Sequence, residues 1–377
     1  MLRKSLMTAL SVAVVLGLGA CTKKNSNEIK IGHYGSMTGG AATFGQSTDK
    51  GIKMAVEELN AAGGINGKQI KLVTFDTQSK NEEASTVVTR LITQEKVVAI
   101  LGEVASSRSL AAAPIAQSNK IPMISPSSTN PKVTEVGDFI FRVCFIDPFQ
   151  GTVMAKFATE NLKAKKVAIL RDVKSDYSVG LADFFKKGFE ERGGTVPEDL
   201  SYQEGDIDFK AQLTKIRTQN VDAIFVPGYY TEVGLIARQA KQLGIKAPLL
   251  GGDGWDSSKL SEIGQDAING SYFSNHYSTD SSDPAVQDFI TKFKAKFGET
   301  PDGLAALGYD SAKVLFEAMK RTKDLTPVQI RDEIAKTADF PGVTGKITLD
   351  ANRNPTKGAV VVKVDGANNR YVTTVNP

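Results

Sequence analysis

Apolar and polar positions follow two rhythms along the chain after residue 28. Short, continuous apolar runs predict buried strands, which cover residues 29–34, 68–76, 97–101, 122–125, 166–170, 195–202, 222–226 and 248–251. Between them, apolar residues three and four positions apart predict amphipathic helices, which cover residues 46–62, 81–94, 107–117, 149–162, 178–192, 208–218 and 232–243. Such alternation is typical of parallel sheets covered by helices on both faces.

The alternation restarts after Pro148, so the chain contains two similar series, residues 29–146 and 147–276. We therefore expect an α/β protein with two doubly wound parallel-sheet lobes. The remainder is more helical, and the Asp-Pro and Thr-Pro pairs at 283–284 and 326–327 are typical helix starts. Short predicted strands end the chain at 345–349, 359–364 and 370–375. No long linker separates the two series, so we expect short hinge segments between the lobes.

The first twenty residues have the pattern of an export signal. Arg3 and Lys4 give a positive start, an apolar stretch follows from Leu6 to Leu18, and small residues precede Cys21. A membrane anchor is the alternative interpretation. However, an apolar stretch of about 13 residues is shorter than the ~20 that a membrane-spanning helix needs.

The sequence LGAC at 18–21 resembles a bacterial lipobox, after which the cysteine is lipidated and becomes the new N-terminus. A single acyl chain gives only marginal membrane binding, and the resemblance implies a multiply acylated Cys21. We expect the polar residues that follow to complete a lipidated tether over 21–27. Cys144 would then have no partner in the chain, and its apolar surroundings predict a buried structural thiol.

Composition excludes several classes of function. The chain has 46 basic and 42 acidic residues, and removing the signal leaves a net charge of only +2 with no basic cluster. A nucleic-acid-binding surface needs such a cluster. Two histidines, His33 and His276, and two cysteines leave little room for a zinc site or a Ser–His–Asp triad, and they exclude a Cys₄ site and a disulfide framework. We expect no metal and no cofactor.

Phosphate-binding loops are also missing from the sequence. Residues 61–69 (AAGGINGKQ) resemble a Walker A loop superficially, but Ala62 stands where the first glycine is needed and Gln69 where the Ser or Thr is needed. The segment is therefore interpreted as a turn between a helix and a strand. No GxGxxG loop and no GxSxG elbow occurs, which weighs against an enzyme with a doubly wound fold.

Hydroxyl-rich loops follow two neighbouring strands of the first series. Residues 102–110 (GEVASSRSL) lead into a helix, and residues 126–131 (PSSTNP) follow the next strand. Open α/β sheets bind ligands at the carboxyl ends of their strands. Ser106, Ser107 and the free N–H groups of the helix would suit a carboxylate. An ordinary serine N-cap is the alternative, but two adjacent loops of the same chemistry favour an anion site.

Aromatic residues and one acid follow the strands of the second series. Asp253 lies between glycines in the loop 252–258, where it could pair with an ammonium group. Tyr177 and Tyr229 follow two other strands, and Trp255 is the only tryptophan. Taken singly, the acid is interpreted as a turn residue and the aromatics as packing. Together they predict a site for a zwitterion at the edge of two sheets.

These segments resemble the type I periplasmic substrate-binding proteins of the leucine/isoleucine/valine-binding class, which serve ABC importers. The resemblance extends from about residue 29 to 364, and it is carried by residues 29–67, 99–134, 205–216, 228–240, 249–260 and 306–313. It implies two lobes that close on a ligand. We expect the N-terminal lobe to comprise 28–146 plus 277–354, and the C-terminal lobe 147–276 plus 355–377.

The resemblance also implies roles for individual residues at the ligand carboxylate and ammonium. Ser106 matches the hydroxyl that binds the α-carboxylate, and the backbone of Ser127 and the hydroxyl of Thr129 match a loop that clasps the carboxylate and amine. Asp253 matches the acid for the α-ammonium. That acid is a glutamate in leucine binders of the family, and its shorter side chain here leaves the ligand's side-chain preference open.

Aromatic positions match the walls of the family's pocket. Tyr177 and Tyr229 match aromatics that contact the ligand on closure, and Phe44 and Tyr309 match residues around the ligand side chain. Beside the shorter acid, either the ligand amine would sit differently or Trp255 would fill the space that is left.

The function expected from the resemblance is that of an extracytoplasmic, lipid-anchored, monomeric receptor. It would bind leucine, isoleucine or valine and present the amino acid to a membrane permease without catalysis. The same fold binding a polar or aromatic amino acid, an amide or a urea-like solute is the alternative.

Overall fold

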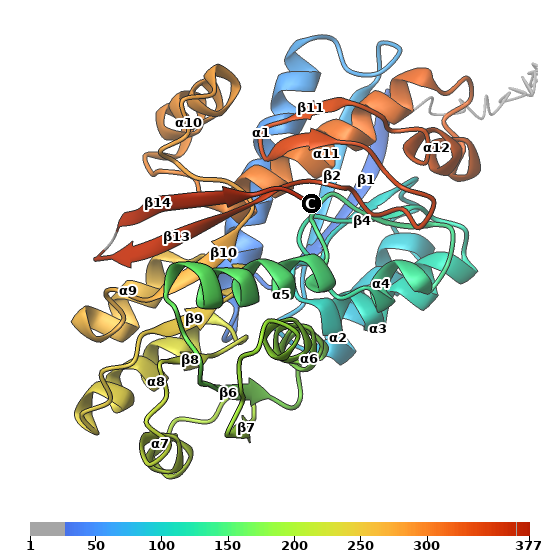
Figure 1. Ribbon diagram of the computed structural model, residues 1–377. Helices are drawn as coiled ribbons and strands as arrows, with labels where there is room; N and C mark the ends of the chain where they lie inside the picture. Colours follow the sequence, from blue (N-terminus) through green and yellow to red (C-terminus); the bar gives the residue numbers. More distant parts are fainter. Residues whose placement is uncertain (1–26, 367) are drawn as a thin grey trace, which may run out of the picture.

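The protein is described by a computed structural model over residues 27–366 and 368–377, and it consists of two α/β lobes (Figure 1). The sheet of the N-terminal lobe has the strand order β2-β1-β3-β4-β5, and all its pairings are parallel. Its strands are β1 (Glu28–Gly35), β2 (Gln69–Asp76), β3 (Ile100–Leu101), β4 (Met123–Ser125) and β5 (Ile140–Arg142).

Helices cover both faces of this sheet. The first part of the chain supplies α1 (Ala42–Ala61), α2 (Asn81–Thr93), α3 (Ser106–Ser118) and α4 (Lys132–Glu135). A later part supplies α10 (Pro284–Phe297), α11 (Gly303–Arg321), α12 (Pro327–Ile334) and the hairpin strands β11 (Phe340–Gly342) and β12 (Gly345–Ile347). In Figure 1, α11 lies beside α1 although about 250 residues separate them along the chain.

The C-terminal lobe has a seven-stranded sheet of order β14-β13-β10-β9-β8-β6-β7. Its strands are β6 (Val167–Asp172), β7 (Asp199–Tyr202), β8 (Ala223–Phe225), β9 (Leu249–Gly251), β10 (Tyr272–Asn275), β13 (Ala359–Asp365) and β14 (Asn368–Val375). The last two pair antiparallel, so this sheet is mixed. Its helices are α5 (Asp147–Lys156), η1 (Phe157–Asn161), α6 (Asp176–Glu190), α7 (Lys210–Arg217), α8 (Tyr230–Gln242), η2 (Asp253–Trp255), α9 (Ser258–Gly264) and η3 (Gln265–Ala267).

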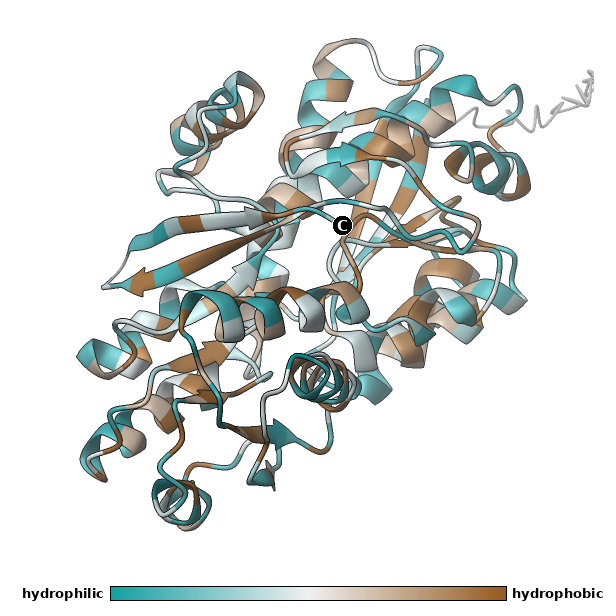
Figure 2. Ribbon diagram, viewed as in Figure 1, coloured by the Kyte–Doolittle hydropathy of each residue, from teal (hydrophilic) through white to brown (hydrophobic). Residues whose placement is uncertain are grey.

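Amphipathic helices enclose the cores of both lobes. Hydrophilic and hydrophobic residues alternate along the outer helices (Figure 2), and the apolar sides of α2 and α3 pack on the first sheet around Leu91 and Ile100. Helices α5 and α6 pack on the second sheet around Phe185 and Phe225, whose rings stack at 3.9 Å. Among the described residues, no helix has the length and apolar character needed to cross a membrane.

Three segments connect the lobes, namely residues 143–146, 276–283 and 348–358. The lobes are closed on each other, because hydrogen bonds join them directly. Ser107 Oγ donates to Asp176 Oδ2 at 2.8 Å, and the hydroxyls of Thr43 and Ser257 lie 2.9 Å apart. Each of these contacts joins the N-terminal end of one helix to a loop or helix of the other lobe.

Glycines allow α1 and α11 to approach closely. A Cβ at Gly51 would lie 2.0 Å from the carbonyl oxygen of Ala305, and a Cβ at Gly308 would lie 2.5 Å from that of Thr48. Both obstacles are backbone atoms, which cannot rotate away. The two helices therefore form a rigid pair that holds the N-terminal end of α11 in a fixed place.

Asp147, the first residue of α5, is a buried acid in the first connecting segment. Its N–H donates to the carbonyl oxygen of Thr129 at 2.9 Å, and Gln150 Nε2 donates to its Oδ1 at 3.3 Å. Burial, with a further contribution from the charge of Asp253, raises the pKa of Asp147 to about 8. The carboxyl group is therefore largely protonated in the folded protein at neutral pH.

The close contact between α1 and α11 predicts that Gly51→Ala lowers the free energy of unfolding by about 3 kcal/mol, since overpacking forces the helices apart. Gly40→Ala is the matched control, because a Cβ there meets nothing within 4 Å, and we expect a change below about 0.5 kcal/mol. Urea unfolding followed by circular dichroism measures both. Equal stabilities of the two variants would contradict this packing.

The raised pKa of Asp147 predicts how stability depends on pH. Its folded pKa of about 8 exceeds an unfolded value of ~3.9, so its contribution to stability is complete below pH ~4 and is lost as pH rises toward 8. We expect Asp147→Asn to gain at least about 1 kcal/mol relative to wild type between pH 5 and pH 9. Urea unfolding at both pH values tests this, and a constant difference between the two proteins would contradict it.

Candidate functional site

A small pocket lies between the lobes at the carboxyl ends of the strands. Its lining combines residues of both lobes: Phe44, Val104, Ser106, Ser127, Tyr177, Tyr229, Asp253, Gly254 and Leu304. Six of the nine residues predicted from the sequence are among them. Hydroxyl groups, one carboxylate and apolar side chains thus meet in one place.

The N-terminal lobe supplies hydrogen-bonding groups to the pocket. Ser106 is the first residue of α3, and its hydroxyl accepts the N–H of Asn130 at 3.2 Å. The first N–H groups of a helix have no partner within the helix and favour an anion. Ser127, in the loop after β4, places its hydroxyl 3.2 Å from Asp253 Oδ2. This side of the pocket is therefore suited to a carboxylate.

The C-terminal lobe supplies the carboxylate of Asp253, which is 4% exposed. Oδ2 accepts hydrogen bonds from Ser127 Oγ and from His276 Nε2, the latter at 3.0 Å. Oδ1 is buried and has no hydrogen-bond partner among the described residues. A buried, unpaired carboxylate oxygen is costly, so this side of the pocket is suited to a cation.

His276 holds the Asp253 carboxylate in place. Burial lowers the pKa of His276, although the carboxylate beside it opposes the change. The ring is therefore neutral at neutral pH, and the hydrogen bond to Asp253 assigns the proton to Nε2. Its face stacks on Phe145, with ring centroids 3.8 Å apart.

Gln150, on α5, holds the backbone of Asp253 in place through a hydrogen bond. Gln150 Oε1 accepts the N–H of Asp253 at 2.8 Å and the hydroxyl of Ser274 at 2.9 Å. A Cβ at Gly252 would lie 2.6 Å from the same oxygen and 2.5 Å from the hydroxyl of Tyr177. Glycine is thus needed beside Asp253 because the chain passes so close to these groups.

Aromatic rings form one wall of the pocket. Tyr177 and Tyr229 stack with an interplanar angle of 4° at 5.4 Å, and Phe44 meets Tyr229 edge-on at 5.4 Å. The hydroxyl of Tyr177 accepts the N–H of Gly254 at 3.2 Å. Burial raises the pKa of both tyrosines, so both hydroxyls stay neutral and can donate. Phe44 and Leu304 together form an apolar region beside the polar groups of the pocket.

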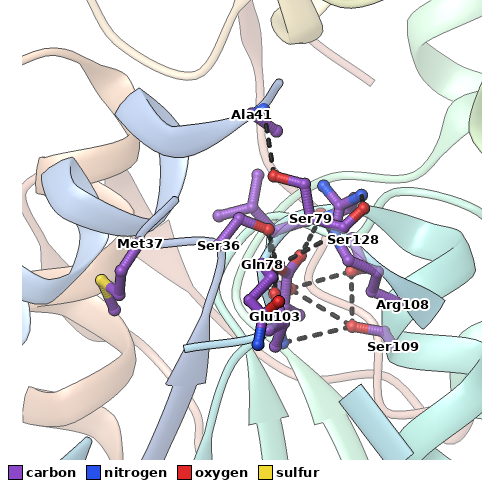
Figure 3. Close-up of polar contacts among 12 residues, drawn as sticks. Ser36, Met37, Ala41, Gln78, Ser79, Glu103, Arg108, Ser109 and Ser128 are labelled. Atoms are coloured by element: carbon purple, nitrogen blue, oxygen red, sulfur yellow. Dashed lines mark hydrogen bonds and ion pairs between the residues drawn. The ribbon is translucent and has the colours of Figure 1, made fainter. Parts of the chain in front are cut away.

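A buried ion pair supports the first hydroxyl-rich loop (Figure 3). Glu103 Oε1 accepts hydrogen bonds from Ser36 Oγ at 2.5 Å and from Arg108 Nε at 3.0 Å, and Oε2 accepts the N–H of Ala105 at 2.7 Å. Ser128 Oγ donates to the carbonyl oxygen of Glu103 at 2.9 Å. Both loops that carry pocket hydroxyls are therefore tied to one carboxylate residue.

Arg142, on β5, supports the second loop. Its guanidinium is fully buried and donates to the carbonyl oxygens of Ser128 and Asn130, the latter at 2.9 Å. Cys144 is free and buried beneath the same loop, and burial raises its pKa to about 12. An inert thiol is consistent with its expected structural role.

Three predicted pocket residues lie outside the lining. Trp255 fills the core of the C-terminal lobe, where its Nε1 donates to the carbonyl oxygen of Val226 at 3.0 Å. Tyr309 packs on Phe289, and its hydroxyl donates to Glu58 Oε2 at 2.6 Å. Neither ring is therefore part of the pocket lining in which the sequence analysis expected them.

Thr129 lies in the second loop, next to the pocket but not in its lining. Its carbonyl oxygen accepts the N–H of Asp147, and its hydroxyl is buried without a hydrogen-bond partner among the described residues.

Sequence reasoning missed three lining residues: Val104, Gly254 and Leu304. Val104 and Gly254 lie in the loops after β3 and β9, which the sequence analysis had already assigned to the site, so both residues could have been predicted. Leu304 comes from α11, far along the chain, and only the contact between α1 and α11 brings it to the pocket. The supporting role of Glu103 could also have been predicted, because an acid directly after a buried strand needs a hydrogen-bond or ion-pair partner.

The side chains of the pocket are suited to binding a ligand. Among residues 27–366 and 368–377, no three His, Cys, Asp or Glu side chains are grouped so that they could hold a metal ion. The polar groups of the pocket comprise an anion-binding side and a cation-binding side, which meet where Ser127 contacts Asp253, and an apolar region lies beside them. This arrangement matches a small zwitterion with an apolar side chain.

Comparison with known proteins identifies relatives over nearly the whole chain. Residues 28–369 match the family described as periplasmic binding protein. A leucine-binding protein, LivK, from Thermotoga maritima has 45% identity and a TM-score of 0.89, covering 93% of this chain and 99% of that one. The branched-chain amino acid transporter substrate-binding protein LivJ from Streptococcus pneumoniae, solved with isoleucine, has 38% identity and a TM-score of 0.89, covering 93% and 100%.

A relative from Pseudomonas aeruginosa is named a leucine-, isoleucine-, valine-, threonine- and alanine-binding protein. It is 32% identical over 347 residues, which cover 91% of each chain. Two α/β lobes, a pocket between them and a family match over nearly all described residues lead to one conclusion. This chain belongs to the periplasmic binding protein family.

Proposed function

We propose that this protein binds leucine, isoleucine or valine between its lobes and delivers the amino acid to the permease of an ABC importer. The observation that carries the proposal is the unpartnered Oδ1 of Asp253, buried in a pocket whose opposite side is lined by hydroxyls. An α-ammonium group would satisfy this oxygen with a charge-assisted hydrogen bond. No bond is made or broken in this function.

Each part of the amino acid has a matching group in the pocket or in the loop beside it. Ser106, the first N–H groups of α3, the backbone of Ser127 and the hydroxyl of Thr129 bind the α-carboxylate. Asp253 binds the α-ammonium. The ligand side chain packs against the apolar wall, which consists of Phe44, Val104 and Leu304, and Tyr177 and Tyr229 cover it from the other lobe.

The small pocket and the names of the relatives support a small ligand. The cavity volume is about 10 Å³, far below the ~300–1,000 Å³ of sites for drug-sized molecules. The relatives from Thermotoga maritima and Streptococcus pneumoniae are named for leucine and for branched-chain amino acids. The relative from Pseudomonas aeruginosa adds threonine and alanine to the ligands in its name, so a test panel must include both.

The family places the protein outside the cytoplasm. We propose further that Cys21 is lipidated after removal of residues 1–20, and that the protein acts as a monomer tethered to the membrane. Both the signal and the tether residues before 27 lie outside the described part of the chain. The polar sequence after Cys21 and the start of β1 at Glu28 support a short tether that ends where the folded lobe begins.

Titration calorimetry with leucine tests the proposed ligand and the role of Asp253 together. We expect wild type to bind and Asp253→Ala to lose about 10²–10³·⁵-fold in affinity, because a buried ammonium without its acid costs ~3–5 kcal/mol. Asp253→Asn should lose less, since its remaining oxygen can still accept from Ser127 and His276. A loss below tenfold for Asp253→Ala would make this acid a turn residue only. Binding of uncharged amides instead of amino acids would overturn the proposed ligand class.

Lipidation predicts the behaviour of Cys21→Ser. The variant should accumulate as an unprocessed or soluble form, whereas leucine binding persists because the site lies entirely after residue 28. Mass spectrometry of the N-terminal peptide from native membranes measures the acyl groups directly. Wild-type protein without acyl mass on Cys21 would contradict the proposal.

A further inference from the structure

The turn that carries Asp253 contacts the opposite lobe at three separate points. Ser127 binds Asp253 at the pocket, as described above. Beyond it, the N–H of Gly303 donates to Asp256 Oδ2 at 2.6 Å, and Ser257 Oγ lies 2.9 Å from Thr43 Oγ1. Neither Asp256 nor Ser257 lines the pocket. A stretch of five residues thus combines a ligand-binding group with two contacts whose only partners across the cleft are helix N-terminal ends.

The contact at Asp256 is a helix cap supplied by the other lobe. Gly303 is the first residue of α11, and its N–H has no partner within the helix. The helix's own N-cap, Asp302, uses Oδ1 to accept the N–H of Ala305 at 2.8 Å. Asp256 satisfies a second N–H of the same end, and α11 has this second cap only when the lobes are closed.

The surroundings of Asp256 fix it for this contact. Its side chain is 5% exposed, and the Asn275 side chain hydrogen-bonds to its carboxylate. The N–H of Asp256 donates to the carbonyl oxygen of Asp253 at 3.0 Å, so the two acids lie on one tight turn. On the other side, Gly51 and Gly308 hold α11 rigidly against α1. A rigid helix end thus faces a rigid turn.

We propose that Asp256 is a positioning residue that stabilises the closed state, by capping α11 across the cleft and thereby fixing the turn that presents Asp253. We call the contact between Asp256 and the N-terminal end of α11 the interlobe latch. The inference rests on the proposed ligand-binding function. Because the latch exists only in the closed state, it shifts the equilibrium between open and closed forms and so strengthens ligand retention.

The latch has an electrostatic cost that limits its strength. Asp256 is buried and Asp302 is half-buried at one helix end, and desolvation raises the pKa of Asp256 and raises that of Asp302 to about 7. The positive end of the helix dipole compensates part of their repulsion. We therefore expect a moderate effect, a five- to thirtyfold loss of affinity when the latch is removed.

Gly303 provides a way to open the latch without changing any charge. A Cβ at this position would lie 2.8 Å from Asp256 Oδ2 and 2.6 Å from Asn275 Oδ1. Both oxygens belong to the C-terminal lobe, so Gly303→Ala obstructs only the closed state. In an open form the added methyl group favours the helix.

The test compares three latch variants with a matched control in the full chain, purified in detergent. The variants are Asp256→Ala, Asp256→Asn and Gly303→Ala. Asp283→Ala is the control, because Asp283 caps α10 through the N–H of Ala285 at 2.8 Å, is exposed, and has no contact with the C-terminal lobe among the interactions described. Calorimetry gives leucine affinity, a chase with unlabelled leucine gives the dissociation rate of radiolabelled leucine, and thermal unfolding without ligand gives stability.

We expect Asp256→Ala and Gly303→Ala to release leucine five- to thirtyfold faster, with association and ligand-free stability little changed. Asp256→Asn should retain part of the wild-type affinity through its oxygen, and Asp283→Ala should bind as wild type does. Wild-type rates in both Gly303→Ala and Asp256→Ala, with leucine bound normally, would overturn the latch alone. Absence of leucine binding in wild type would instead overturn the proposed function, and the inference with it.

Discussion

The buried carboxylate of Asp253 imposes the constraint on which the rest of the site depends. One oxygen accepts hydrogen bonds from Ser127 of one lobe and His276 of the connecting segment, and the other oxygen has no partner among the described residues. Such a group is stable in a closed cleft only if a cation completes it. Neutral His276 cannot supply that charge, because burial lowers its pKa.

The two lobes bring the carboxylate of Asp253 close to the hydroxyl-rich loops, which are suited to bind the carboxylate of a ligand. Parallel strands place all their carboxyl ends at one side of each sheet, and closure sets the two edges against each other. Glu103 and Arg142 fix the hydroxyl-rich loops of one edge, and Gln150 fixes the turn of the other. The lobes contact each other through several hydrogen bonds and through the ring of Phe44, and a ligand that binds both edges shifts the balance further toward the closed state.

Much of the fold could be predicted from the sequence because the periodicities are strong. The alternation of apolar runs and amphipathic segments matches β1, β2 and β6, and also α1, α2, α3 and α5, within a few residues, whereas the short helix α4 was not predicted. Strand lengths were overestimated where apolar residues continue beyond the hydrogen-bonded ladder, as at β3, which is only Ile100–Leu101. Strands β5 and β10 were missed although Gly137-Asp138 and Asn269-Gly270 precede them, because each strand has only three or four residues and shows no clear periodicity.

Site residues could be predicted where local sequence decides their position. Ser106, Ser127 and Asp253 directly follow strands, so their place at the sheet edge follows from topology. Side-chain direction does not follow from it: Trp255 turns inward against the backbone of Gly251, and Tyr309 turns toward Glu58. Leu304 depends on tertiary packing between helices remote in sequence, which periodicity alone does not reveal.

Mass spectrometry of the solute released on denaturation tests the central claim most directly. Protein purified from its native membrane without added ligand and then denatured should release leucine, isoleucine or valine in up to one equivalent. These solutes carry the ammonium group that Asp253 requires. A released solute without a cationic nitrogen, such as a urea-like compound or an aromatic acid, would contradict the account.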